Sequence, residues 1–156
     1  MSRTHALAAA PLIPVLAPVY RTAAPAADVL VRAATGLFLV PHGAQKLFGW
    51  FGGYGLEATG QFFASKLGLP AGLALLAGTI EVFGGLALAF GLATRAAAAL
   101  VFGLMAVAVV QVHLGNGFFW TSGGYEYPLL WAILALSYVV KGGGRHSIDA
   151  LIGREL

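Results

Sequence analysis

The sequence predicts an all-α membrane protein, built as a bundle of four transmembrane helices with a short interfacial helix in the first loop. Two observations point to this fold class. Hydrophobic residues make up 59% of the 156 residues and charged residues only 10%, whereas charged residues form about a quarter of an ordinary soluble domain. Four apolar segments approach the length of about 20 residues that a helix needs to cross a bilayer. These segments account for most of the chain, which leaves no room for a separate soluble domain.

Charge and cysteine content exclude two other classes of function. The nine Lys and Arg residues give a formal net charge of +3, but they are scattered at segment ends, and binding to nucleic acid needs a clustered basic face. We therefore expect no nucleic-acid partner. The chain has no cysteine, so it has no disulfide, iron–sulfur ligand or thiolate metal site of its own. Any thiol chemistry must be carried by a partner protein.

The first 27 residues are rich in proline. They contain Pro11, Pro14, Pro18 and Pro25, and each proline removes a helix hydrogen bond, too often for a spanning helix. The basic start, the apolar stretch and the small residues of TAAPAA resemble a secretory signal peptide, but the prolines split the apolar run. We expect residues 1–27 to form an uncleaved arm, cytoplasmic or interfacial, that lies on the membrane surface or on a neighbouring subunit.

The four-helix domain is predicted to occupy residues 28–141. Its first span runs from about Asp28, which suits an N-cap position, to about Phe48. Polar residues recur along this span at steps of three, four or seven, which places them on one helix face. They are Asp28, Arg32, Thr35, His42 and Lys46. We expect this polar stripe to face the bundle, and we expect a bend just before His42 because Pro41 cannot donate to the preceding turn.

The loop after this span, residues 49–68, begins with aromatic residues among glycines. Trp50, Phe51 and Tyr54 suit the headgroup level of a membrane, where amphipathic rings are enriched. A short interfacial helix is predicted over about 56–67, because its apolar residues would gather near one face. Both features place this loop at a membrane surface.

The second span is predicted from Pro70 to about Phe90 and contains Glu81. At 1.5 Å per residue, Glu81 lies about 16 Å from Pro70, near the bilayer midplane. Small residues share its helix face and would let another helix approach closely. These are Ala74, Gly78, Gly85 and Ala89. We therefore expect Glu81 to point into the bundle.

The third span is predicted from Arg95 to about His113, and the fourth, from about Tyr127 to Val140, is short for a membrane core of about 30 Å. Between them lies a second glycine and aromatic loop, LGNGFFWTSGGYEY. Residues 142–156 are predicted to be a basic cytoplasmic tail with a short surface helix. Seven of the nine Lys and Arg residues fall on the side of the two termini. The positive-inside bias then puts both termini in the cytoplasm and both aromatic loops outside.

Glu81 is the first candidate for chemistry. An ionisable group inside a membrane costs about 2.5 to 3.5 kcal/mol on insertion scales, so Glu81 needs a partner or must stay protonated. His42 lies within about 5 Å of the same depth on the antiparallel helix, and the two could pair. Such a pair can pass protons or bind a quinone oxygen; alternatively, both groups are hydrogen-bonded and only fix the packing. Lys46, one turn further out, is expected to extend to the outer headgroups rather than act as an acid.

Two histidines raise the question of a metal. His42 and His113 lie toward the outer ends of two helices, and histidines on separate helices can ligate a haem iron. The chain has neither a Glu-x-x-His pair for a di-iron centre nor a C-x-x-C-H motif for haem attachment. We expect no metal site, and we expect His113 to be a hydrogen-bonding residue at the membrane interface.

Several stretches form a recognisable set. They are HGAQKLFGWFGGYGLEATGQFFASKLGLP, Glu81 in the second span, GLATR, VHLGNGFF, GGYEYPL and the tail GRHSIDALIG. In this order they resemble the DoxX family of small four-helix bacterial membrane proteins, over roughly residues 28–153. His146 stands in the tail where the family leads us to expect a tyrosine, and the proline-rich arm lies outside the resemblance.

The resemblance implies a characteristic cluster of residues. Its candidate catalytic residues are His42, Glu81 and Lys46. Its candidate cofactor-binding residues are Trp50, His113, Asn116, Tyr125 and Glu126. Some family members resemble or form the membrane subunit of a thiosulfate:quinone oxidoreductase, and others are described as membrane partners of superoxide-detoxifying or thiol-handling proteins. Many have no assigned activity.

Two functions remain open from the sequence. The first is a small inner-membrane subunit associated with a redox system, in which the His42 and Glu81 cluster contacts a quinone or relays protons; whether the chain is itself an enzyme stays undecided. The second is a non-catalytic accessory or assembly subunit of a larger membrane complex. Either would be a multi-pass protein of the bacterial inner membrane whose partner is a membrane or periplasmic redox protein or a larger complex. A small-solute transporter is disfavoured because no internal repeat is detectable.

Overall fold

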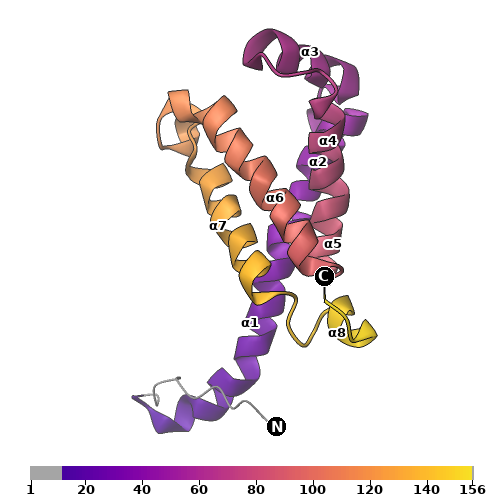
Figure 1. Ribbon diagram of the computed structural model, residues 1–156. Helices are drawn as coiled ribbons and strands as arrows, with labels where there is room; N and C mark the ends of the chain where they lie inside the picture. Colours follow the sequence, from indigo (N-terminus) through magenta and orange to yellow (C-terminus); the bar gives the residue numbers. More distant parts are fainter. Residues whose placement is uncertain (1–11, 156) are drawn as a thin grey trace.

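The computed structural model describes residues 12–155, and all regular structure in that range is helical (Figure 1). Long helices are continued or connected by short 3₁₀ or π turns. In chain order the elements are η1 (Pro14–Leu16), α1 (Ala17–Leu37), α2 (Leu39–Phe48), η2 (Trp50–Gly52), α3 (Gly55–Leu67), α4 (Leu73–Thr79), η3 (Ile80–Gly84), α5 (Gly85–Phe90), α6 (Thr94–Ala108), η4 (Val109–His113), η5 (Leu114–Asn116), η6 (Trp120–Ser122), α7 (Glu126–Lys141) and α8 (Ile148–Ile152). The predicted all-α class is confirmed, since no strand occurs among the described residues.

Three helical stretches of the described chain are long and apolar enough to cross a membrane, judged by length and composition. They are Pro14–Phe48, Leu73–Phe90 and Thr94–Asn116. The fourth predicted span, α7, has 16 residues, which is about 24 Å at 1.5 Å per residue and less than a hydrocarbon core of about 30 Å. It packs antiparallel against α6 (Figure 1).

The first helix starts earlier than the sequence predicted. α1 begins at Ala17 and continues through Pro25, so the prolines do not keep this part of the arm out of the first long helix. Pro14 and Pro18 fall in the first turns of η1 and α1, where a missing N–H costs little. Only Pro25 is internal to the helix. The part of the predicted arm in residues 1–11 lies outside the described range.

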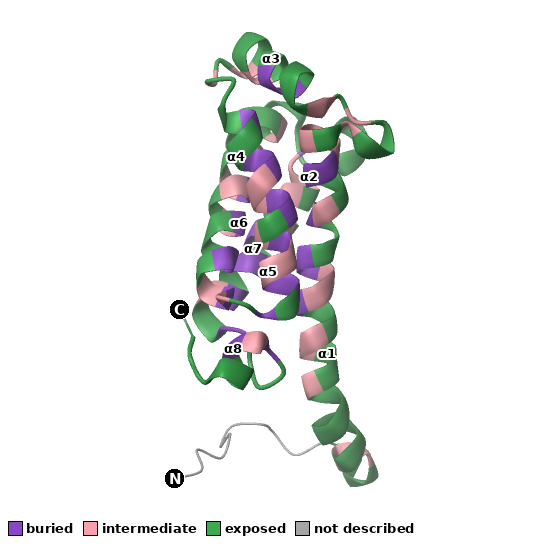
Figure 2. Cartoon of the chain, turned by 90° about the vertical axis from the view of Figure 1, so that its right-hand side faces the viewer, coloured by how far each residue is buried: buried purple, intermediate pink, exposed green. Residues whose placement is uncertain are grey.

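The second half of α1 is the part that enters the bundle. Its buried residues are Arg32, Thr35 and Gly36, and Figure 2 shows the first half extending beyond the other helices with most of its surface exposed. Asp28 lies inside the helix rather than at its cap. Its carboxylate pairs with Lys141 at the end of α7, which ties α1 to the last long helix.

Glycines let the helices approach closely at two levels. A Cβ placed on Gly36 of α1 would lie 2.2 Å from the carbonyl oxygen of Gly85 in α5. A Cβ on Gly43 of α2 would lie 2.7 Å from the carbonyl oxygen of Gly78 in α4. The small residues predicted to line one face of the second span are all buried. They are Ala74, Gly78, Gly85 and Ala89. The predicted close helix contact on this face is confirmed.

The first span is interrupted close to the place where the bend was predicted. α1 and α2 are interrupted at Phe38, one turn before His42. Pro41 has no N–H, so it cannot donate to the Leu37 carbonyl as the helix would require. Before the interruption α1 packs against α5, and after it α2 packs against α4 and η3.

Two clusters of buried apolar residues hold the α6–α7 pair to the bundle. One contains Leu39, Val101, Met105, Ala132 and Ala135, and the other contains Leu88, Ala97, Ala98 and Tyr138. In Figure 1 this pair meets α1 and α5 at one end and separates from α2 and α4 toward the loops. Both aromatic loops lie at that open end, and α8 lies at the other.

Candidate functional site

A lysine and a glutamate form an ion pair within the apolar helices. Lys46 Nζ lies 2.8 Å from Glu81 Oε1 and 2.7 Å from Glu81 Oε2, so it donates to both oxygens. Glu81 is only 5% exposed, as the sequence predicted for a residue that points into the bundle. The Lys46 side chain is 26% exposed. The carboxylate is therefore almost enclosed, whereas the ammonium group lies at the edge of the pair.

Helix packing brings these two side chains together. Gly43 lies almost one turn before Lys46 in α2, and because it has no side chain, α2 can contact Gly78 and the Cβ of Glu81. Glu81 itself lies in η3, which is a π-helical turn, and such turns are frequent at functional sites. The close approach places the carboxylate within reach of the lysine.

The pairing matters energetically because each charge alone would be costly in a membrane. An isolated ionised group costs about 2.5 to 3.5 kcal/mol on insertion scales. The attraction between two close charges and their hydrogen bonds offsets part of this cost. Among the described residues, no buried side-chain nitrogen or oxygen lacks a hydrogen-bond partner. The pair is thus a satisfied polar element in an apolar setting.

One expectation about this cluster was wrong, and one alternative that the sequence left open is decided. Lys46 does not extend to the outer headgroups but turns inward to Glu81. His42 does not pair with Glu81; its side chain is exposed, and its backbone carbonyl accepts from Lys46 Nζ at 3.4 Å. The reason is geometric, since Gly43 rather than His42 contacts Glu81 across the helix interface. The long lysine side chain spans the distance that remains.

The predicted polar residues of the second loop bond within that loop. His113 Nδ1 and Asn116 Nδ2 donate to the Gly123 carbonyl at 2.7 and 3.2 Å. Glu126 Oε2 accepts from the Trp120 backbone N–H at 3.1 Å. His113 is therefore a hydrogen-bonding residue, as expected. These contacts close the loop on itself.

Aromatic side chains pack against one another within each of the two loops. The Tyr125 ring packs edge-on against Phe118, with centroids 5.6 Å apart. The ring centroids of Trp50 and Phe48 lie 5.0 Å apart, and Trp50 is 60% exposed. Within the part of the chain that the structure describes, no hydrogen bond, ion pair or aromatic contact links the two loops, and no group of three His, Asp or Glu could hold a metal. The candidate cofactor-binding residues thus form two separate groups, neither bonded to Glu81.

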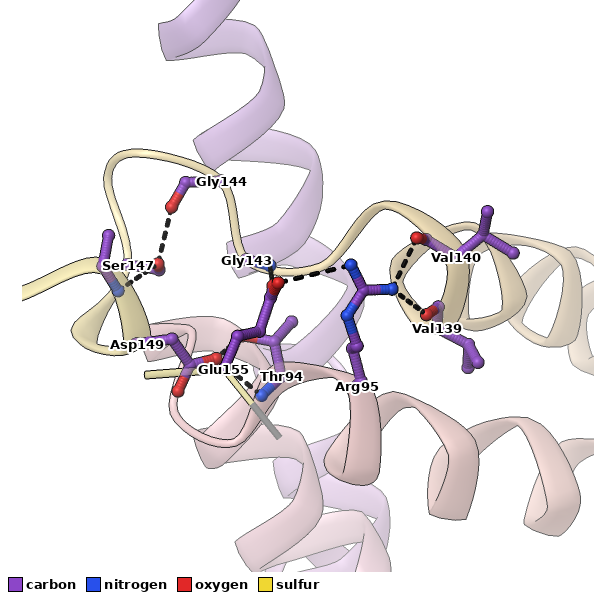
Figure 3. A network of polar contacts seen from close by, with 10 residues as sticks. Thr94, Arg95, Val139, Val140, Gly143, Gly144, Ser147, Asp149 and Glu155 are labelled. Atoms are coloured by element: carbon purple, nitrogen blue, oxygen red, sulfur yellow. Dashed lines mark hydrogen bonds and ion pairs between the residues drawn. The ribbon is translucent and has the colours of Figure 1, made fainter. Parts of the chain in front are cut away.

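A second polar cluster, at the opposite end of the bundle, was not predicted (Figure 3). Asp149 of α8 accepts from the backbone N–H groups of Ala93 and Thr94 at 2.7 and 2.8 Å, and from the Thr94 hydroxyl at 2.6 Å. Burial alone would raise the pKa of Asp149. The three hydrogen bonds and the charge of Arg32 outweigh burial and hold this pKa below its ordinary value.

Arg32 joins the same end of the bundle to the tail. Its guanidinium is buried at 2% exposure and donates to the carbonyls of Ala89 at 3.3 Å, His146 at 2.7 Å and Gly143. Ala89 lies near the end of α5, where carbonyls have no helical donor. Arg32 was expected to face the bundle, but its partners, from α5 and the tail, could not be inferred.

Local signals for this cluster do exist in the sequence. Ser147 precedes the apolar run of α8, and its hydroxyl accepts from the Ala150 N–H at 3.1 Å as a helix cap. Glu155 accepts from the Gly143 N–H at 2.9 Å and from Arg95 at 3.2 Å (Figure 3). A capped helix in the tail was therefore predictable, but its docking onto α6 was not.

Comparison with known proteins gives consistent matches. A family model described as DoxX matches residues 27–114. A protein named "Putative oxidoreductase CatD" from Bacillus subtilis (strain 168) is 31% identical over 124 residues, covering 80% of this chain and 85% of that protein. An uncharacterized protein from Haemophilus influenzae is 34% identical over 104 residues, covering 60% of this chain and 78% of its own length. No solved structure matches. This chain belongs to the DoxX family.

Proposed function

We propose that this protein is an inner-membrane subunit associated with a redox system, in which Lys46, paired with Glu81 and with His42 beside it, contacts a quinone head group or relays protons. With its long apolar helices and DoxX membership, the chain is a multi-pass membrane protein. The observation that carries the proposal is the ion pair itself, because an ionisable pair among spanning helices is expensive and marks a functional site by default. A relative named as an oxidoreductase supports the redox association.

The residues present fit a quinone head group, which offers two carbonyl oxygens as acceptors. Lys46 Nζ is a donor at the edge of the pair, with a quarter of its side chain exposed. His42 exposes its imidazole one turn earlier on the same helix. When bound, the quinone takes up electrons, which a partner redox protein would supply. The role of this chain is then to donate hydrogen bonds from Lys46 and His42 and to hold the compensating charge on Glu81.

The same proposal includes the topology of the chain. α7 would be the fourth span, shielded by α6, and both termini would be cytoplasmic. Basic residues support this orientation because most of the described ones lie at the α8 end of the bundle. They are Arg21, Arg32, Arg95, Lys141, Arg145 and Arg154, whereas Lys46 and Lys66 lie toward the loops. The ion pair then lies in the outer half of the membrane.

A binding assay tests the proposed site. A short-chain quinone is titrated into the purified chain, and quenching of the intrinsic tryptophan fluorescence reports the dissociation constant. Loss of a hydrogen bond to a charged donor costs about 1.5 to 3 kcal/mol, so Lys46→Gln is expected to weaken binding at least tenfold. Glu57→Gln with Lys66→Gln, two exposed changes in α3, should leave binding unchanged. Quinone binding that is absent from the intact chain, or equal in Lys46→Gln, would contradict the proposal.

One observation favours the second candidate function, a non-catalytic accessory or assembly subunit. Both oxygens of Glu81 already accept from Lys46, and Glu81 is enclosed. A closed pair of this kind is what a purely structural link between α2 and η3 would show. Mild-detergent purification from the native host separates the candidates. Stable recovery inside a larger complex, together with full activity of that complex in a Lys46→Met, Glu81→Leu variant, would establish the accessory role.

A further inference from the structure

α8 is held at the level where α5 ends and α6 begins. Asp149 accepts from the N-terminal backbone of α6 at Thr94, and its own N–H donates to the Gly91 carbonyl at 2.9 Å. Figure 2 shows α8 just below the ends of these helices. α5 and α6 belong to stretches long enough to cross a membrane, so the topology proposed above, on which this inference rests, puts α8 at the depth of the lipid headgroups.

The outward side of α8 is apolar. Leu151 is 85% exposed and Ile152 is 59% exposed. Val140, at the neighbouring end of α7, is 71% exposed. Apolar side chains beside basic residues are typical of a helix that rests in the boundary between headgroups and acyl chains. This surface therefore suits a membrane interface better than water.

Two arginines beside α8 have no partner in the described part of the chain. Arg145 and Arg154 line a hollow of about 310 Å³ between the tail loop and α8, and neither side chain makes a hydrogen bond or ion pair with residues 12–155. The other charged groups of the hollow are engaged. Lys141 pairs with Asp28, Asp149 accepts from Thr94, and Glu155 accepts from Arg95 and Gly143.

We propose that this hollow, lined by Arg145 and Arg154, binds the phosphate group of an anionic phospholipid from the cytoplasmic leaflet. Guanidinium groups recognise phosphate through paired, charge-assisted hydrogen bonds. The two carboxylates of the hollow stay ionised, but each accepts from donors of its own: Asp149 from Thr94, and Glu155 from Gly143 and Arg95. Three cationic side chains, Lys141, Arg145 and Arg154, outnumber them in the lining. Leu151 and Ile152 lie on the same short helix and would contact the acyl chains of the bound lipid.

A lipid suits this site better than a soluble phosphate compound. The proposed topology puts the hollow at headgroup depth, and its lining includes α8, which carries the exposed Leu151 and Ile152. Arg145 also lines a second hollow of about 450 Å³ against Pro25 and Val29 of α1, which continues the basic surface toward an apolar helix. The cytoplasmic leaflet is the one that carries anionic lipid and attracts basic segments.

Native mass spectrometry of the full chain, released from nanodiscs of equal parts phosphatidylcholine and phosphatidylglycerol, tests this proposal. A basic residue near an anionic surface contributes about a fivefold gain in binding. Arg145→Gln with Arg154→Gln should therefore lower phosphatidylglycerol retention about 25-fold. Arg145→Lys with Arg154→Lys should keep most of it, which separates loss of the site from loss of the fold. Arg21→Gln with Lys66→Gln, which removes equal charge elsewhere, should retain the lipid.

Thermal unfolding in the same nanodiscs supplies a second readout. Phosphatidylglycerol should raise the melting temperature of the wild-type chain over phosphatidylcholine alone, and the double glutamine variant should lose this rise. Equal lipid retention by the double glutamine variant and its charge-matched control would overturn the proposal. So would an equal rise produced by inorganic phosphate in phosphatidylcholine nanodiscs, because the site would then take a soluble anion.

Discussion

Removing one member of the Lys46–Glu81 pair is predicted to destabilise the bundle far more than removing both. Lys46→Met leaves a carboxylate that is 5% exposed without its cation. Breaking a buried pair in this way costs about 3 to 5 kcal/mol, and we expect about 3 kcal/mol here because Lys46 is partly exposed. Glu81→Leu should cost less, since the freed lysine can extend toward the headgroups.

The double variant separates the contribution of the ion pair from the effects of the two single substitutions. Replacing a buried ion pair by apolar residues of similar volume is often neutral or stabilising, so Lys46→Met with Glu81→Leu should unfold within about 1 kcal/mol of the wild-type chain. The coupling free energy between the two positions would then be at least about 2 kcal/mol.

Equilibrium unfolding in mixed micelles, driven by added SDS and followed by circular dichroism, measures each free energy. Glu57→Leu with Lys66→Met in α3 is the matched control, because both side chains are exposed and form no ion pair with each other in the described chain. Its coupling should stay within about 0.5 kcal/mol of zero. If the costs of Lys46→Met and Glu81→Leu simply add, the pair does not stabilise the membrane bundle and the reasoning fails.

Two further predictions concern the packing and the tail. Gly36→Ala should destabilise the bundle by about 1 to 3 kcal/mol, because the new Cβ would lie 2.2 Å from the Gly85 carbonyl oxygen, whereas Gly103→Ala, with no atom within 4 Å, should be neutral or stabilising in the same unfolding titration. Asp149 has a folded-state pKa below its ordinary value of 3.8, so its contribution is fully present above that value and is lost as the pH falls through the lowered pKa. Asp149→Asn should remove this pH dependence from the melting temperature, measured by thermal unfolding between neutral and acidic pH. A melting temperature of the variant that falls with pH as steeply as that of the wild-type chain would contradict the assignment.

Features that depend on helix periodicity could be predicted from the sequence. Gly78 and Gly85 lie on the same face as Glu81 because of their spacing, and all three are buried. The interruption of the first span before His42 was expected from the chemistry of Pro41. In each case the relevant neighbours lie within two helical turns, where backbone geometry alone sets the relation.

The partner of Glu81 could not be predicted in the same way. His42 and Lys46 lie one turn apart on one face of α2, and an estimate of depth favoured the histidine. Which side chain reaches the carboxylate depends on how closely the helices approach, and that is decided by the contact between Gly43 and Gly78. Side-chain length then favours the lysine.

Contacts between segments far apart in the chain also could not be predicted from the sequence. Asp149 and Thr94 are 55 residues apart, and no spacing rule relates a tail residue to the first turn of α6. Pro25 is the opposite case: here the local rule that proline breaks a helix failed, because α1 continues through it. One internal proline removes only one hydrogen bond, and a helix that is otherwise continuous tolerates it.

Photoaffinity labelling with an azido-quinone tests the proposed quinone contact most directly. The purified chain is labelled in nanodiscs, and the modified peptides are mapped by mass spectrometry. The proposal predicts label on α2 around His42 and Lys46 and on η3 around Glu81, with competition by unlabelled quinone and loss of label in Lys46→Gln. Label confined to other helices, or label that excess quinone does not displace, would contradict it.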